Sequence, residues 1–251
     1  MINTEHREDG LLRIEIDRPR KLNALSEGLK DEVVRVLERT DDSEVRAVLL
    51  EGAGDRAFSA GADIDGFSGR KPHETEPSRL NRLVDEYPRP TLAKIDGFCL
   101  GGGFELALAC DLRIATTDSE FGFPEIDIGL LPGGGGTQRA IRMLPEARAK
   151  ELVFRGTRLD AQTAAEWGLI NRAVPESELG STVESFLSDL LEGPPIALEK
   201  AKRVMNEGRD VGLSAGLEME AQAFGLALSS EDATEGTTAF MEDREPKFEG
   251  N

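Results

Sequence analysis

The chain has 251 residues, of which 48 are acidic and 30 are basic, so its formal net charge is −18. Only 8 of the basic residues are Lys and 22 are Arg. This charge excludes nucleic acid and acidic lipid surfaces as expected partners, because both are themselves polyanions. The acidic residues are spread along the chain. They fit an ordinary soluble protein that resists aggregation, or a protein adapted to a cytoplasm of high salt concentration, which is the interpretation we prefer.

The hydrophobic content of 39% supports a core of one large domain, or of one domain with an appendage. No apolar stretch approaches 18 residues, so we expect no membrane span. The first ten residues, MINTEHREDG, are charged and lack the apolar region of a signal peptide. Cys99 and Cys110 stand in apolar surroundings, which favours buried, reduced thiols. These features predict a cytoplasmic protein.

The first predicted elements alternate between strand and helix. Residues 11–17, LLRIEID, alternate apolar and polar side chains and predict a strand. The loop RPRKLNALS follows, and Ser26 is placed to cap a helix that extends to about Thr40. Residues 45–50, VRAVLL, form a near-continuous apolar run that predicts a buried strand.

The next segment, GAGDRA at 52–57, matches the spacing of a dinucleotide-binding glycine motif. Such a motif must open a helix, yet SAGADIDGFSG follows, which is too rich in Gly and Asp to form one. A nicotinamide oxidoreductase is therefore the disfavoured interpretation. The glycines of SAGAD are better explained as backbone that presents the N–H of Ala62 to a ligand oxygen.

Residues 65–90 are polar and rich in proline, with a short helix predicted over 78–86. Neither His73 in this segment nor His6 near the N-terminus is assigned a role, because a lone loop histidine is usually solvated. Strands are predicted at 91–95, which leads into a glycine-rich stretch, and at 112–115.

That stretch, residues 97–139, contains the residues on which the functional hypothesis depends. Gly101–Gly103 precede an apolar run at 106–110 that predicts a short helix, and Glu105 lies on its first turn. The free N–H groups at a helix start attract negative charge. Glu125 follows Pro124, and a second glycine run, 133–136, leads into a helix at Thr137. Two carboxylates beside a backbone anion site suit a reaction that passes through an enolate.

The C-terminal third is predicted to be mainly helical. Ser230 or Asp232 is the expected cap of its last helix. The expected helices span about 145–154, 160–167, 176–191, 196–207 and 213–228, followed by a final block at 230–248.

Several blocks closely resemble the crotonase family, the enoyl-CoA hydratase/isomerase superfamily. They read AFSAGADI at 57–64, GGGFELALACD at 101–111 and FGFPEIDIGLLPGGGGTQR at 121–139. A family-like link at 155–175 and a closing signature at 230–248 extend the resemblance to nearly the whole chain. It implies an α/β fold with a spiral of strand-strand-helix turns over 1–190. A C-terminal helical region over 191–251 would pack between subunits of a homotrimer or a dimer of trimers.

The resemblance also implies the site. Glu105 and Glu125 occupy the positions of the two hydratase glutamates, and the N–H groups of Ala62 and Gly102 those of the oxyanion hole. The expected substrate is an acyl-CoA, with CoA as part of the substrate and no further cofactor or metal. The candidate substrate and CoA contacts are Arg20, Lys21, Asn23, Ala24, Ala60, Asp63, Ile64, Gly101, Pro132, Gly133 and Lys247.

Two positions depart from the family pattern. Family members often carry lysine where Asp65 and Asp243 stand here, and both lysines commonly face the CoA phosphates. Their loss leaves Arg20, Lys21, Arg244 and Lys247 as candidates for those contacts. Asn23 has a purely structural alternative, in which it closes the turn of the RPRKLNALS loop.

The chemistry that the resemblance implies is syn addition of water to a 2-enoyl-CoA thioester. Ala62 and Gly102 would bind the thioester oxygen, Glu105 would activate water, and Glu125 would deliver a proton to the α-carbon. The main alternative is a Δ3,Δ2-enoyl-CoA isomerase of the same family, against which the presence of both glutamates argues. A catalytically silent member that acts as a subunit or scaffold is the other alternative.

Overall fold

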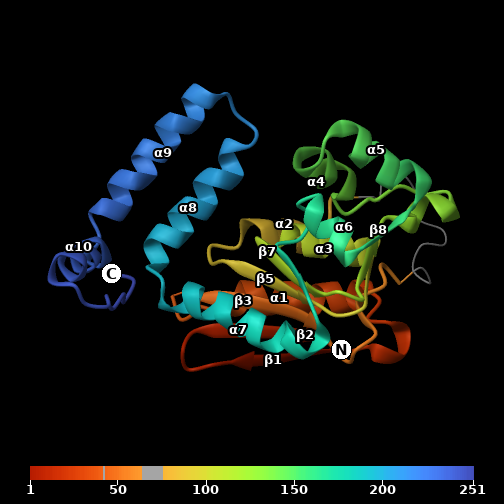
Figure 1. The fold of residues 1–251 in the computed structure, drawn as a ribbon, viewed down its shortest axis with the longest axis horizontal. Coiled ribbons are helices and arrows are strands. Elements are labelled where there is room, and N and C mark those ends of the chain that lie inside the picture. The colour runs from red at the N-terminus through yellow and green to blue at the C-terminus, as the bar shows by residue number, and fades with distance from the viewer. Residues whose placement is uncertain (42, 64–75) are drawn as a thin grey trace.

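The computed structural model describes residues 1–41, 43–63 and 76–251. Within these ranges the chain forms two β-sheets, surrounding helices and a helical arm at the C-terminus (Figure 1). The strands are β1 (Ile2–His6), β2 (Leu11–Ile16), β3 (Ala47–Gly52), β4 (Ala57–Ser59), β5 (Thr91–Ile95), β6 (Phe98–Leu100), β7 (Leu112–Thr116), β8 (Glu120–Gly122), β9 (Arg158–Asp160) and β10 (Arg172–Val174).

Most of the helices begin and end within a few residues of their predicted bounds. The 3₁₀ segments are η1 (Pro19–Lys21) and η4 (Pro124–Ile128). The α-helices are α1 (Glu27–Arg39), α2 (Arg79–Glu86), α3 (Gly102–Ala109), α4 (Gly136–Met143), α5 (Glu146–Arg155), α6 (Ala161–Glu166), α7 (Glu176–Glu192), α8 (Pro195–Gly208), α9 (Leu213–Leu228) and α10 (Glu231–Glu242).

The order of the strands confirms the predicted spiral. The larger sheet runs β1-β2-β3-β5-β7-β10 and the smaller runs β4-β6-β8-β9. Successive turns of the chain place one strand in each sheet and then a helix: β3, β4 and α2, then β5, β6 and α3, then β7, β8 and α4. Helix α3 follows β6 almost directly, and a glycine run precedes each of α3 and α4.

The larger sheet is covered on both faces. Ile14, Leu50 and Ala93 are adjacent in one row of the sheet and are fully buried in the cluster that includes residues of α1, α2 and α3. The alternate side chains of the same strands, such as Leu49 and Leu92, pack against α7 on the opposite face. Because side chains alternate along a strand, the nearly continuous apolar runs of β3 and β5 supply both faces.

Local capping signals account for several helix starts. Ser26 accepts a hydrogen bond from the N–H of Leu29 and caps α1, as predicted. Ser230 caps α10 through the N–H of Ala233, and this decides between the two predicted caps. Asp232 instead accepts hydrogen bonds from the N–H groups of Glu249 and Gly250, so it fastens the end of the chain to α10.

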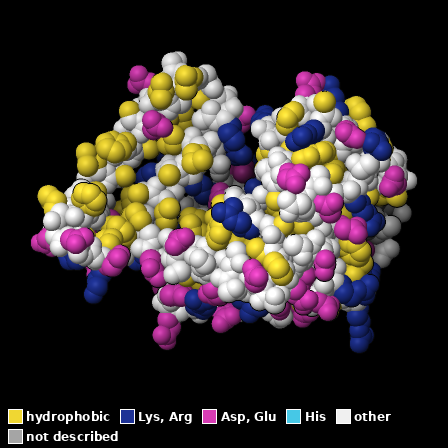
Figure 2. Space-filling model, in the orientation of Figure 1, with side chains coloured by type: hydrophobic (Ala, Val, Ile, Leu, Met, Phe, Trp, Pro, Cys, Tyr) yellow, Lys and Arg dark blue, Asp and Glu magenta, His cyan; other side chains and the backbone are white. Residues whose placement is uncertain are grey.

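The C-terminal helices form an arm that extends away from the sheets (Figure 1). Helix α7 still packs on the larger sheet and ends at Glu192, so the predicted boundary at 190/191 falls within its last turn. Helix α9 contributes no buried residue. Its apolar side chains, and Phe240 of α10 at 88% exposure, lie at the surface, and Figure 2 shows apolar atoms along the arm.

Several ion pairs fasten the arm to the body. Lys202 of α8 pairs with Asp111 at 2.7 Å, and Arg209 at the end of α8 pairs with Asp85 of α2 at 3.3 Å.

Cys99 and Cys110 are both buried free thiols, as predicted. In the described part of the chain, we find no helix long and apolar enough to cross a membrane.

Candidate active site

The start of α3 contributes residues to the candidate site. The helix begins at Gly102, four residues before the apolar run that predicted it, so Glu105 does lie on its first turn. Gly101 precedes it with φ of +49°, in the left-handed region that glycine adopts without strain. The N–H of Gly101 donates to Gly122 O in β8, whereas the N–H of Gly102 has no acceptor among the described residues. A helix start held in this way presents a free donor.

The N–H of Ala62 lies beside that of Gly102. The N–H of Leu25 donates to Gly61 O at 2.8 Å and the N–H of Asp63 donates to Leu25 O at 3.0 Å, so the N–H of Ala62 between them points away from Leu25. A Cβ added to Gly102 would lie 3.2 Å from Ala62 N. The structure therefore brings together the two donors that the sequence predicted for an oxyanion hole.

Glu105 is 4% exposed, and the second glycine run holds its carboxylate. Its Oε1 accepts hydrogen bonds from the N–H groups of Gly134, at 2.7 Å, and Gly136, at 2.8 Å. Burial raises the pKa of this carboxyl, while the two N–H groups and the Arg139 guanidinium oppose that rise. Glu105 is thus a buried carboxylate whose ionised form is hydrogen-bonded on one oxygen.

Glu125 has a different environment. It lies in η4, directly after Pro124, and a Cβ added to Gly101 would lie 2.8 Å from its Oε1. Its Oε2 is buried without a hydrogen-bond partner among the described residues. Burial raises the pKa of Glu125 to about 7, and the negative charge of Glu105 adds to this rise. At neutral pH, a large fraction of Glu125 is therefore protonated.

The two glutamates and the two N–H groups consequently lie around one point at the start of α3. Glu125 contacts Gly101, Gly102 carries one donor, and Glu105 is one turn further along the same helix. Environments that hydrogen-bond the anion of one carboxyl and leave the other without a partner are suited to a base and an acid acting together.

The loop before α1 is held by polar contacts. Asn23 is fully buried, and its amide donates to Ala53 O and Ala57 O while its carbonyl accepts from the N–H of Arg18. Its side chain closes the loop, which matches the structural alternative, and a direct substrate contact of that side chain has no support here. Arg18 also pairs with Asp63 at 2.8 Å.

Other contacts join this loop to the segment that carries Ala62. Lys21 pairs with Asp63 at 3.5 Å, and Ala24 O accepts a hydrogen bond from Arg18. Arg20 is exposed, and the N–H of Ala60 donates to Leu22 O. The loop and the oxyanion segment are therefore joined, and the predicted roles of these residues toward CoA stay predictions.

Of the remaining candidates, Pro132 and Gly133 precede the glycines that hold Glu105, with Pro132 buried and Gly133 exposed. Lys247 is exposed near the end of the arm, beyond α10, so a single chain does not bring it to the start of α3 (Figure 1). Arg244 pairs with Glu235 and Glu242 on the same arm. Ile64, Asp65 and His73 lie outside the described residues.

Three residues that sequence reasoning did not select also belong to the site. Arg18 fastens Asp63, Asn81 of α2 donates to Gly134 O at 2.8 Å, and Arg139 of α4 contacts the same carbonyl. The first and last stand inside sequence blocks quoted above, but no local pattern distinguishes them from surface arginines. Asn81 is separated from Gly134 by 53 residues, so no local signal could identify it.

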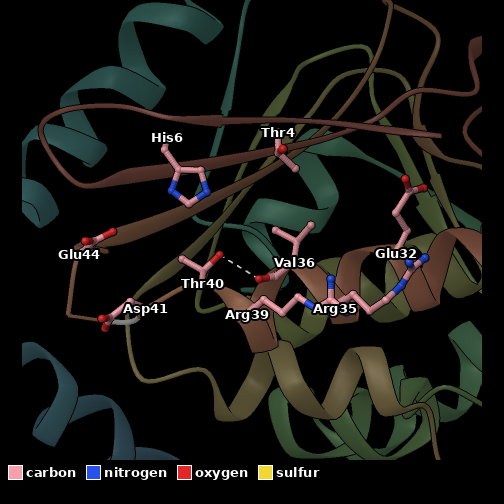
Figure 3. Close-up of a pocket in the computed structure, with 9 residues that line it drawn as sticks. All are labelled: Thr4, His6, Glu32, Arg35, Val36, Arg39, Thr40, Asp41 and Glu44. Atoms are coloured by element: carbon pink, nitrogen blue, oxygen red, sulfur yellow. Dashed lines mark hydrogen bonds between the residues drawn. The ribbon is translucent and has the colours of Figure 1, made fainter.

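Two other candidate sites are not supported. GAGDRA is followed by β4 rather than by a helix, which confirms the objection to a dinucleotide site. A surface groove between β1 and α1 contains His6, but its cations Arg35 and Arg39 lie among three acids (Figure 3). Those acids are Glu32, Asp41 and Glu44. None of the residues predicted for catalysis or substrate binding lines this groove.

Comparison with known proteins agrees with this geometry. A family model described as enoyl-CoA hydratase/isomerase matches residues 6–251. A short-chain-enoyl-CoA hydratase of Clostridium acetobutylicum is 38% identical, over 94% of this chain and 92% of its own. A crotonyl-CoA hydratase of Syntrophomonas wolfei is 36% identical, over 96% and 95% of the two chains.

Solved structures give the same result. The crystal structure of an enoyl-CoA hydratase from Bacillus anthracis superposes with a TM-score of 0.93 at 36% identity, and covers 100% of this chain and 99% of that one. The sequence blocks, the spiral and these comparisons are concordant. The chain belongs to the enoyl-CoA hydratase/isomerase family, the crotonase superfamily.

Proposed function

We propose that this protein is an enoyl-CoA hydratase, which adds water to a 2-enoyl-CoA thioester and gives a 3-hydroxyacyl-CoA. The observation that carries the proposal is the pair of buried glutamates in contrasting environments beside two free backbone N–H groups. Relatives named short-chain-enoyl-CoA hydratase and crotonyl-CoA hydratase support it over nearly their full length. CoA enters as part of the substrate, and the mechanism needs no further cofactor.

In this mechanism, Ala62 N–H and Gly102 N–H bind the thioester oxygen, where negative charge develops as the enolate forms. Ionised Glu105 takes a proton from water as the water oxygen bonds to the β-carbon. Protonated Glu125 gives its proton to the α-carbon, and the enolate collapses to the thioester. Proton exchange between the two carboxyls through solvent restores the starting state. Glu105 acts as the base because two N–H groups stabilise its anion, and Glu125 as the acid because burial favours its neutral form.

The isomerase alternative is less well supported. Moving a double bond needs one carboxylate to shuttle a proton, and it gives no reason for a second, separately stabilised carboxylate. A silent scaffold would have no need for the unpaired carboxyl oxygen of Glu125, because an unpartnered buried polar atom costs stability. Both arguments favour the hydratase.

The direct test is an assay of the purified protein with crotonyl-CoA, tiglyl-CoA and longer 2-enoyl-CoAs in molar KCl. We expect loss of the enoyl thioester absorbance and formation of the 3-hydroxyacyl product, which mass spectrometry identifies by the gain of one water. Conversion of 3-enoyl-CoA without hydration of any 2-enoyl-CoA would favour the isomerase. Inactivity on both substrate classes would favour the scaffold.

We also propose that the arm packs against other copies of the chain in a trimer or a dimer of trimers. We further propose that the protein is located in the cytoplasm. The exposed apolar residues of α9 and α10 support this, because apolar surface of this extent is stabilised by burial. The two buried free thiols support a reducing compartment. In such an assembly, an arm from another copy could carry Lys247 toward a CoA phosphate.

Salt dependence provides a test of the proposed adaptation to high salt. The net charge of −18 repels neighbouring copies and also CoA, whose phosphates are anionic. The screening length is about 3 Å at 1 M salt and about 10 Å at 0.1 M, so both repulsions nearly vanish in molar KCl. We expect the oligomer mass from light scattering and the hydration rate to fall together below 0.1 M salt and to recover in molar KCl. An unchanged mass with a lower KM at low salt would contradict the adaptation.

A further inference from the structure

Arg139 is a partly buried cation in contact with the glycine run that binds Glu105. It lies on the first turn of α4, and its side chain is 16% exposed. Its Nη1 donates to Gly134 O at 3.4 Å and its Nη2 donates to Asn81 O at 3.5 Å. Its Nε is buried without a partner among the described residues. Burying one guanidinium nitrogen without a partner costs free energy, which suggests that the position serves more than the stability of α4.

The contacts of Arg139 converge on the residue that binds Glu105. Gly134 O accepts from both Arg139 and Asn81, while Gly134 N–H donates to Glu105 Oε1. The guanidinium also packs against Gly135, whose φ is +108°. Four consecutive glycines have little conformational preference of their own. Side chains that hold the Gly134 carbonyl therefore restrict the backbone between the two N–H groups that donate to Glu105.

The charge of Arg139 acts on the same carboxylate. Burial raises the pKa of Glu105, and the guanidinium opposes this rise, as Lys30 of α1 also does. Among the described residues, the carboxyl of Glu125 on η4 also interacts with Glu105, and its charge acts in the opposite direction. On its far side, Arg139 pairs with Asp85 of α2 at 3.6 Å, and Asp85 also pairs with Arg209 of α8. The guanidinium is thus held between α2 and the glycine run.

We propose that Arg139 is a positioning residue for hydration: it locks the second glycine run and maintains Glu105 as an ionised base for water activation. This inference rests on the proposed function. Arg139 acts through Gly134 and through its charge, and no contact with the substrate is required of it. A base that must ionise inside a water-poor site needs such a counter-charge, because burial favours its neutral form.

The test compares Arg139→Gln, Arg139→Lys and the matched control Arg142→Gln in the pH profile of kcat on crotonyl-CoA. Arg142 lies on the same helix but is 43% exposed and pairs with exposed Asp210. Without the charge at position 139, Glu105 should protonate at higher pH, so the acid limb should move up, and at a pH on that limb the rate should fall about tenfold per pKa unit of displacement. The basic limb, which reports Glu125, should move less.

Arg139→Lys should restore the acid limb, because it restores the charge, and Arg142→Gln should leave the profile unchanged. A merely structural role predicts a different result: the Arg139→Gln rate would fall equally at every pH, with no displacement of the acid limb and no rescue by lysine. That result would overturn the proposal, as would a displacement of equal size in Arg142→Gln.

A second measurement separates this proposal from the proposed function, because it needs no activity. The pH dependence of the free energy of unfolding is compared between the parent and Glu105→Gln, each with and without Arg139→Gln. At each residue type of position 139, the unfolding free energy of the Glu105→Gln protein is subtracted from that of the protein that retains Glu105. The pH dependence of this difference reports the titration of Glu105 in the folded protein. We expect Arg139→Gln to move that titration to higher pH even if the parent hydrates no substrate. An unmoved titration would refute the positioning role, whatever the activity of the parent.

Discussion

Glu105→Gln should abolish most hydration of crotonyl-CoA, by about 10²–10⁴-fold in kcat, while some conversion of 3-enoyl-CoA to 2-enoyl-CoA persists. Hydration needs a base for water, whereas isomerisation needs one carboxyl at the α-carbon, which Glu125 supplies. Glutamine retains a carbonyl oxygen that can accept from the N–H groups of Gly134 and Gly136. The loss can therefore be assigned to proton transfer rather than to a cavity or a displaced loop.

Glu125→Gln should suppress both reactions, since both depend on a proton at the α-carbon. The two variants are compared with the same two substrates, with hydration followed by absorbance and isomerisation by product analysis. Normal hydration by Glu105→Gln would place water activation on another group, and the isomerase would become the better description. Equal losses of both reactions in both variants would contradict the division of roles between the two carboxyls.

Thermal and denaturant unfolding across pH provides the folding control for Glu125→Gln. Burial raises the pKa of Glu125 to about 7 from an ordinary value of 4.5, so its ionisation opposes folding. The sign follows from linkage: stability is lost as pH rises from about 4.5 through 7. Removing the ionisable group should therefore leave the variant more stable than the parent above pH 7. A variant that is inactive yet more stable at pH 8 has lost chemistry and not structure.

These residues also show which parts of the molecule the sequence could predict. Ser26 caps α1 through the N–H of Leu29, three residues further along the chain, so the start of this helix has a local signal. Strands β2, β3 and β5 are marked by the alternation or continuity of their apolar side chains. Strand β1, INTEH, carries no such pattern and is mostly exposed; it forms because it pairs with β2. Local chemistry therefore predicts an element only where the element's own residues determine it.

The candidate site divides in the same way. Glycine runs and glutamates are visible in the sequence, and the family resemblance assigned their roles. The donors to Glu105 were not predicted, because Gly134 and Gly136 are 29 and 31 residues away and are brought to it by the spiral. The buried, unpartnered oxygen of Glu125 likewise depends on packing between η4 and the start of α3. Proximity in space, which sets the acidity of each carboxyl, has no local signal.

Gly102→Ala should cost about 10²–10³-fold in kcat/KM for hydration, because its methyl group would occupy the place that the proposed mechanism gives to the thioester oxygen. The added Cβ would lie 3.2 Å from Ala62 N, where a bound oxygen accepts its hydrogen bond. The backbone at Gly102 has no positive φ, so alanine at this first position of α3 introduces no backbone strain. The variant therefore retains both N–H groups and blocks the proposed hole sterically, although the backbone of Ala62 must yield by a few tenths of an ångström.

Gly102→Pro makes the complementary change, since it removes the N–H itself. It should lose at least as much activity, a transition-state loss of about 3 kcal/mol for one missing donor. Gly180→Ala at an exposed position of α7 is the matched control, because a Cβ there meets open space, and it should retain the parent rate. Fold and oligomer mass are checked first by circular dichroism and light scattering. If well-folded Gly102→Ala and Gly102→Pro both hydrate crotonyl-CoA at the parent rate, the thioester oxygen must bind elsewhere, and the pairing of Ala62 with Gly102 is only a consequence of the turn.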